Sequence, residues 1–169
     1  ASRYSCTMLT RDAHRARWLV NGDEAFAAMR ELIDAASQSV RMEFYMFRPA
    51  EPAESLRASL LAARRRGVPV SLVYDAFGSE GLPADFFDTL KAEGAQVVAF
   101  SPARQLRLAF RDHRKLLVCD GQVAILGGLN VGPEYAGDGV TRGWRDLALL
   151  IEGPVVASLA HGFDAMLAL

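Results

Sequence analysis

A histidine and a lysine stand two residues apart at the head of an apolar run, in the stretch FRDHRKLLVCDGQVAILGGLN (110–130). Strand side chains alternate between two faces, so His113 and Lys115 should point the same way and Arg114 the opposite way. An imidazole that can act as nucleophile or proton carrier would then lie beside a fixed positive charge. The pair suits a phosphate ester, whose oxygens need neutralising before the phosphorus is attacked. A basic strand end in solvent would show the same spacing.

Five residues that follow this pair each have an ordinary structural explanation. Asp120 and Gly121 suit the two central positions of a tight hairpin. Gly127 and Gly128 suit a bulge or a close approach of two backbone segments, and Asn130 suits a helix cap. Singly, none of them indicates a function, but their order and spacing form a pattern.

The spacing H-x-K-x4-D, followed by G-G-x-N, resembles the signature of the phospholipase D superfamily; its residues here are His113, Lys115, Asp120, Gly127, Gly128 and Asn130. Within that superfamily the chain is most similar to the first halves of bacterial cardiolipin synthases. The similar stretches include NGDEAF, MEFYMF, RRRGVPVSLVYDAFGS, HRKLLVCDG, GGLNVGPEY and WRDLALLIEGPVV. They run in the same order over nearly the whole chain from Asn21 onward, which makes coincidence improbable.

The resemblance implies a phosphodiester exchange that needs neither a metal nor a cofactor. His113 would attack the phosphorus and form a phosphohistidine. Lys115, Gly128 and Asn130 would bind the phosphoryl oxygens, so the step combines covalent with electrostatic catalysis. The three histidines of the chain show no zinc-ligand spacing.

Three carboxylates could support this chemistry. Asp146, in the stretch WRD, matches the position from which family members orient the nucleophilic imidazole, although by spacing alone it could equally pair with Arg145. Asp120 belongs to the catalytic motif, but we expect it to serve the turn and its hydrogen bonds rather than the phosphorus. Glu43 lies inside a predicted strand and either reaches the site or pairs with an arginine, and we favour the ion pair.

Enzymes of this family use two such motifs, one histidine as nucleophile and the other as the acid that protonates the leaving alcohol. This chain has one motif, because His14 and His161 are not followed by lysine two residues later. The second motif would come from a missing C-terminal part of the same chain, from an identical chain in a homodimer, or from a different chain. We therefore expect an isolated monomer to do little chemistry.

Superfamily membership leaves lipids and nucleic acids as possible substrates. We favour a phospholipid such as phosphatidylglycerol, because the GGLN and WRD segments resemble phosphatidyltransferases, whereas single-motif nucleases more often have serine in place of Gly128. Nucleic acid is less expected, because 19 basic against 20 acidic residues give no basic field. The alternatives are a dimeric nuclease and a non-catalytic half-domain that binds phosphate headgroups.

The order of the elements predicts one domain over residues 1–169 with an α/β fold, namely a phospholipase D-like half. We expect a mixed, mainly parallel central sheet flanked by helices on both faces. Helices are predicted over 21–36, 53–67, 84–94 and 154–169. Strands are predicted over 40–47, 68–75, 95–100, 113–119, 122–128 and 144–153.

Several features predict where the protein acts. The sequence contains no apolar run of the about 18 residues that span a membrane and no signal-peptide core. Cys6 and Cys119 are expected to be reduced thiols, which suits a cytoplasmic protein. The stretch SPARQLRLAF (101–110), where leucines alternate with arginine, could lie on the inner membrane as a peripheral contact or form a covered loop with its arginines in solvent.

Overall fold

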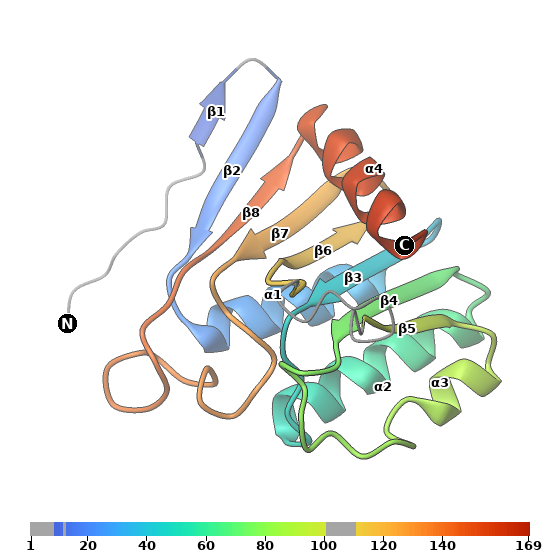
Figure 1. The fold of residues 1–169 in the computed structure, drawn as a ribbon. Helices are drawn as coiled ribbons and strands as arrows, with labels where there is room; N and C mark the ends of the chain where they lie inside the picture. The colour runs from blue at the N-terminus through green and yellow to red at the C-terminus, as the bar shows by residue number, and fades with distance from the viewer. Residues whose placement is uncertain (1–8, 12, 101–110) are drawn as a thin grey trace.

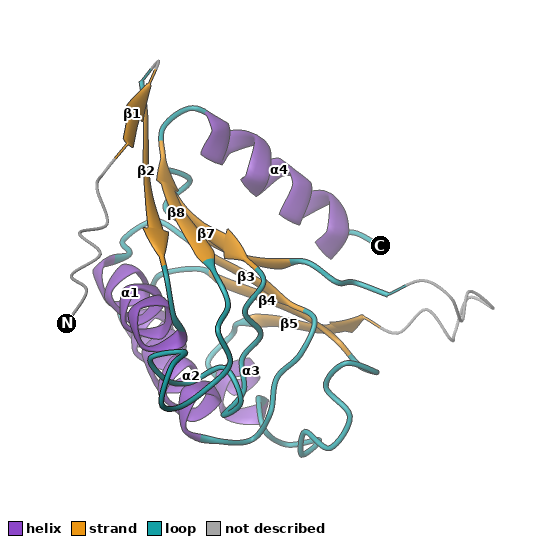
Figure 2. Cartoon of the chain, turned by 90° about the vertical axis from the view of Figure 1, so that its left-hand side faces the viewer, coloured by secondary structure: helices purple, strands orange, loops and turns teal. Residues whose placement is uncertain are grey.

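The computed structural model describes residues 9–11, 13–100 and 111–169. Within them, one sheet of eight strands has helices on both faces (Figures 1 and 2). The elements are β1 (Leu9–Arg11), β2 (His14–Leu19), α1 (Gly22–Ala35), β3 (Val40–Phe44), α2 (Glu51–Arg65), β4 (Val70–Asp75), α3 (Asp88–Ala92), β5 (Gln96–Phe100), β6 (Lys115–Cys119), β7 (Val123–Gly127), β8 (Ala148–Glu152) and α4 (Val155–Leu167). The mixed α/β fold and the helices on both faces are confirmed.

The strands are ordered β1-β2-β8-β7-β6-β3-β4-β5 across the sheet. Among these described strands, β3, β4 and β5 pair in parallel, and the other five pairings are antiparallel. The prediction of a mainly parallel sheet is therefore wrong in that one respect. The strand and helix alternation covers only the first half of the chain, whereas the β6–β7 hairpin and its neighbours pair antiparallel.

The β1–β2 hairpin was not predicted. The sequence of β2, HRARWL, has arginines at its half-exposed and exposed positions, and only Leu19 at its end is fully buried. Such an edge strand lacks the clear apolar alternation of an interior strand.

Alternation along β6 divides the core between two layers. Leu117 and Cys119 pack on the side of α1, α2 and α3, whereas Leu116 and Val118 pack with Phe163 of α4. Figure 2 shows α4 on one side of the sheet and the other helices on the opposite side. Because β6 is buried on both faces, its start is fixed firmly at one edge of the core.

Within the residues described, none of the helices has both the length and the apolar character needed to cross a membrane. The proposed membrane contact, SPARQLRLAF, and the thiol of Cys6 lie outside the described residues. Cys119 is buried in β6.

Candidate active site

The histidine and lysine lie together where β6 begins. Lys115 Nζ is 3.0 Å from His113 Nδ1 and donates to the His113 carbonyl oxygen at 2.7 Å. Arg114 points to the opposite face, where its guanidinium binds Glu43 and the carbonyl oxygen of Gly162 on α4. The prediction that His113 and Lys115 share a face is thus confirmed.

Lys115 is 7% exposed, whereas His113 is exposed. Burial lowers the pKa of the Lys115 ammonium, and the charges of Asp112 and Asp146 act in the opposite direction. An ammonium can only donate hydrogen bonds, so Nδ1 is the acceptor of the contact at 3.0 Å and the ring proton of a neutral His113 lies on Nε2. A cation and an accessible imidazole are therefore presented side by side.

Tyr45, the residue after β3, packs against both groups. Its ring centroid is 4.7 Å from that of His113, and Lys115 Nζ is 5.2 Å from the Tyr45 centroid. Gly78 makes room for this ring, because a Cβ there would lie 2.8 Å from two of its atoms. The sequence reasoning missed Tyr45; the aromatic run EFYMF at the end of a strand was its only signal.

Asp146 lies against Gly128. A Cβ on Gly128 would collide with the Asp146 carboxylate, whose Oδ1 accepts a hydrogen bond from Leu147 N–H at 2.7 Å. In the described part of the chain no hydrogen bond joins Asp146 to His113, and the charge of Asp146 acts on Lys115 instead. Gly128 therefore allows this carboxylate to approach the site, while the orienting role expected of Asp146 stays a prediction.

Asn130 is 5% exposed and lies beyond the end of β7. Its Nδ2 donates to the Tyr135 hydroxyl at 2.9 Å, and its Oδ1 is buried without a hydrogen-bond partner among the described residues. Asn130 does not cap a helix; instead the next residue, Val131, forms a parallel bridge with Phe47. The amide is thus fixed by Tyr135 and retains one unused polar atom.

Asp120 lies outside the candidate site. It follows the last residue of β6, about 16 Å along the strand from Lys115. Its carboxylate accepts the N–H groups of Ser37, Gln38 and Ser39 at 2.7–3.0 Å. Burial would raise the pKa of Asp120, but these hydrogen bonds outweigh it and the pKa is lowered. The motif aspartate therefore holds the turn between α1 and β3, as expected of its hydrogen bonds.

Glu43 forms the predicted pair with an arginine. It is fully buried, and its Oε1 lies 2.6 Å from Arg114 Nη2. Asp112, 3% exposed, lies next to it, and neither Glu43 Oε2 nor Asp112 Oδ2 has another hydrogen-bond partner in the described structure. Burial and then the Asp112 charge raise the pKa of Glu43 to about 8, so Glu43 holds a proton at neutral pH.

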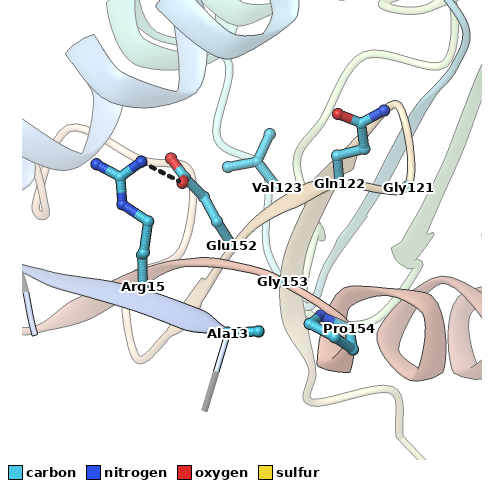
Figure 3. A pocket seen from close by; sticks show the side chains of 8 residues that line it. All are labelled: Ala13, Arg15, Gly121, Gln122, Val123, Glu152, Gly153 and Pro154. Carbon is cyan, nitrogen blue, oxygen red and sulfur yellow. Dashed lines mark ion pairs between the residues drawn. The ribbon is translucent and has the colours of Figure 1, made fainter. Parts of the chain in front are cut away.

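Two hollows in the surface lie at opposite ends of β6. One of about 380 Å³ is lined by His113 and Lys115 as well as by residues of α4. The other, of about 590 Å³, lies by Gly121 and Gln122 at the far end of β6 (Figure 3). Its charged groups are Arg15 and Glu152, 3.7 Å apart in an ion pair. The described lining of this larger hollow has no nucleophilic side chain, whereas the smaller hollow is next to His113. We therefore assign the smaller hollow to the candidate active site.

Metal-ligating side chains do not gather at the site. Among the residues that the structure describes, no three His, Cys, Asp or Glu side chains are grouped so that they could hold a metal ion.

Comparison with known proteins decides the family. Residues 29–167 match the family described as "Cardiolipin synthase, PLD-like domain". The chain belongs to this phospholipase D-like family. Similar proteins include the cardiolipin synthase of Geobacillus kaustophilus, 38% identical over 146 residues, and cardiolipin synthase A of Pseudomonas aeruginosa, 37% identical over 155 residues. These alignments cover 83% and 89% of this chain but 29% and 32% of those proteins, so the chain spans about a third of their length.

Solved structures share the phospholipase D-like fold. Nuc from Salmonella typhimurium, a phospholipase D family member, superposes with a TM-score of 0.66 at 21% identity, over 89% of this chain and 93% of that one. NucT from Helicobacter pylori gives 0.71 at 15% identity, over 92% and 96%. At these identities the similarity establishes the fold. A unit of this size is nearly a whole chain in those two proteins and about a third of the cardiolipin synthases.

Proposed function

We propose that this phospholipase D-like domain is one half of a phosphatidyltransferase that acts on phosphatidylglycerol through a phosphohistidine. The observation that supports this proposal most is the ammonium of Lys115 held 3.0 Å from the His113 ring at the rim of a hollow. A buried cation next to a nucleophile is suited to a substrate that carries a negative charge at the atom under attack.

The reaction would proceed in two displacements. A ring nitrogen of His113 attacks phosphorus with its lone pair, and the bond from phosphorus to the oxygen of the headgroup glycerol breaks. The histidine of a second motif protonates that oxygen. The hydroxyl of another phosphatidylglycerol then attacks the phosphohistidine, its proton passes to the second histidine and the bond from phosphorus to His113 breaks. Two molecules of phosphatidylglycerol thus give cardiolipin and glycerol. Lys115 neutralises the phosphoryl oxygens in both steps.

Asn130 and Asp146 would support these steps. If the Asn130 amide were flipped, its Oδ1 would accept a hydrogen bond from the Tyr135 hydroxyl and its Nδ2 would point to a phosphoryl oxygen. Asp146 would favour the charged form of Lys115 and, once a phosphate draws Lys115 away, orient the His113 ring. Gly128 would contribute by keeping that carboxylate close.

The leaving alcohol requires a second motif. We propose that a partner half supplies it, either from the same protein or from an identical chain, and that the isolated monomer is inactive. The lipid substrate would bring the domain to the inner membrane from the cytoplasmic side as a peripheral contact.

Lipid exchange tests the function directly. The native mass is measured first, and the assembly containing both motifs is incubated with phosphatidylglycerol, with and without added glycerol, beside single-stranded DNA. Cardiolipin formation that glycerol reverses, and that His113→Ala abolishes, is the expected result. DNA hydrolysis without lipid exchange would instead indicate the dimeric nuclease. Headgroup binding without any turnover would indicate a binding half-domain.

A further inference from the structure

The hollow beside His113 lies on the face of the sheet covered by α4. Leu116 and Leu126 form its floor, and Ser158, Leu159 and Gly162 of α4 form its wall. Its lining is mostly apolar, and its volume of about 380 Å³ lies within the range of small-ligand pockets. We name it the α4 pocket.

The apolar floor continues past α4 across the sheet. Leu116 lies opposite Leu126, Leu126 opposite Leu149, and Leu149 opposite Trp18, through strands β6, β7, β8 and β2. Directly opposed residues of antiparallel strands share a face, so these four side chains form one row on the α4 side. Trp18, at the end of the row, is 46% exposed. An apolar track thus leads from the edge that holds His113 across the sheet.

We propose that the α4 pocket binds the apolar part of the phosphodiester, namely the glycerol backbone and the first acyl methylenes of a lipid whose phosphate lies at His113. This inference rests on the proposed function and assigns the part of the substrate beyond the phosphate. One end of the pocket is lined by residues 113–116, where β6 begins, so the pocket lies next to the strand edge that carries His113. A ligand held there through its phosphate therefore has an apolar surface adjacent to it.

The lining of the α4 pocket does not suit the nucleotide that would adjoin the phosphate in a nucleic acid. Among the described residues that line the pocket, none has an aromatic side chain on which a base could stack. Within the described lining the guanidinium belongs to Arg114, which is bound to Glu43 and is therefore not available for a second phosphate. A leucine-lined pocket is instead matched to methylenes, each of which should increase binding about fourfold while it remains within the pocket.

A pair of neighbouring variants on α4 tests the assignment. Ser158 lines the pocket and is exposed, so Ser158→Phe should fill the pocket without disturbing the core. Ala157, also exposed, does not line it, and Ala157→Phe is the matched control. In the assembly with both motifs, Ser158→Phe should lower the ratio of kcat/KM for phosphatidylglycerol to that for bis(p-nitrophenyl) phosphate by about tenfold or more. It should also flatten the dependence on acyl length, and Ala157→Phe should do neither. Equal effects of both variants would overturn the assignment.

A photoreactive lipid gives a readout that does not depend on turnover. Phosphatidylglycerol with a diazirine on an acyl carbon near the glycerol is bound to the same assembly, irradiated and mapped by mass spectrometry. Labels in 116–126 and 155–162 that Ser158→Phe removes are the expected result. Labels elsewhere, or labels found with the isolated chain and lost in the two-motif assembly, would overturn it. Correct labelling without lipid exchange would refute the proposed function and leave the pocket assignment standing.

Discussion

Glu43 and Asp112 place two buried carboxyl groups next to each other directly behind the segment that holds His113 and Lys115. Arg114 binds Glu43 through its side chain, and its backbone N–H donates to Asp112 Oδ1 at 3.2 Å. Asp75, also fully buried, accepts the Asp112 N–H at 3.0 Å. A carboxylate network on three segments therefore fixes the backbone on either side of the nucleophile.

The first prediction concerns the pH dependence of stability. The pKa of Glu43 is raised to about 8, so between about pH 4.5 and 8 the folded chain keeps a proton that the unfolded chain has lost. The free energy of unfolding should therefore fall as pH rises through this window. Glu43→Gln cannot lose a proton and should remove this part of the slope. Urea unfolding between about pH 5 and 8.5 measures it.

A surface variant provides the control for this measurement. Glu31 is exposed on α1, so Glu31→Gln should leave the slope of wild type intact. If wild type and Glu43→Gln have the same slope, the raised pKa of Glu43 is excluded.

The second prediction separates stability from catalysis at Asp120. Asp120→Ala leaves three backbone N–H groups of the α1–β3 turn without their acceptor and should cost about 1–2 kcal/mol. Because the pKa of Asp120 is lowered, its contribution is present above about pH 4 and is lost as pH falls through the folded-state value. Thermal unfolding at neutral and acidic pH measures both effects. A large loss of turnover in fully folded Asp120→Ala protein would show that Asp120 has a catalytic role.

Local sequence was sufficient to predict some of these relationships. The common direction of His113 and Lys115 follows from alternation over three residues, and Asp120-Gly121 has the composition of the hairpin turn. The contact of Glu43 with Arg114 depends instead on the antiparallel register of β3 and β6, which joins residues 71 positions apart. Helices and strands can be predicted from a single sequence, but the register between β3 and β6 cannot. An ion pair of Glu43 could therefore be predicted, but not the arginine that forms it.

The same limit explains why the approach of Asp146 to Gly128 and the position of Tyr45 were not predicted. The approach of Asp146 to Gly128 depends on β7 pairing with β8, and a glycine pair alone does not reveal which side chain lies over it. Tyr45 belongs to an aromatic run that a buried strand also explains. Both contacts join residues that are far apart in the sequence. The spacing of apolar residues along one helix or strand does not predict such contacts.

The third prediction tests the approach of Asp146 to Gly128. Gly128→Ala should displace the Asp146 carboxylate, since the new methyl group needs the same space. A misplacement on this scale at the site should lower kcat/KM by about tenfold to a hundredfold. Asp146→Ala relieves the collision, so in a double-mutant cycle the stability cost of Gly128→Ala should shrink in the Asp146→Ala background. Additive stability effects would mean that the two residues do not compete for space.

The fourth prediction concerns the charge of Lys115 and uses the fact that the chain has only two lysines, Lys91 and Lys115. With carbon-13 on the lysine ε-carbon, NMR should show two signals, and exposed Lys91 serves as the internal reference. Burial lowers the pKa of Lys115, so its signal should titrate below the ordinary lysine value of about 10.4.

The charge of Asp146 opposes this shift, so Asp146→Asn should move the Lys115 titration to still lower pH and leave Lys91 unchanged. In the active assembly the alkaline limb of the pH profile for kcat/KM should move in the same direction, because a neutral Lys115 no longer stabilises the phosphoryl oxygens. A Lys115 signal that does not respond to Asp146→Asn would show that this carboxylate acts elsewhere, with the His113 ring as the first alternative to examine.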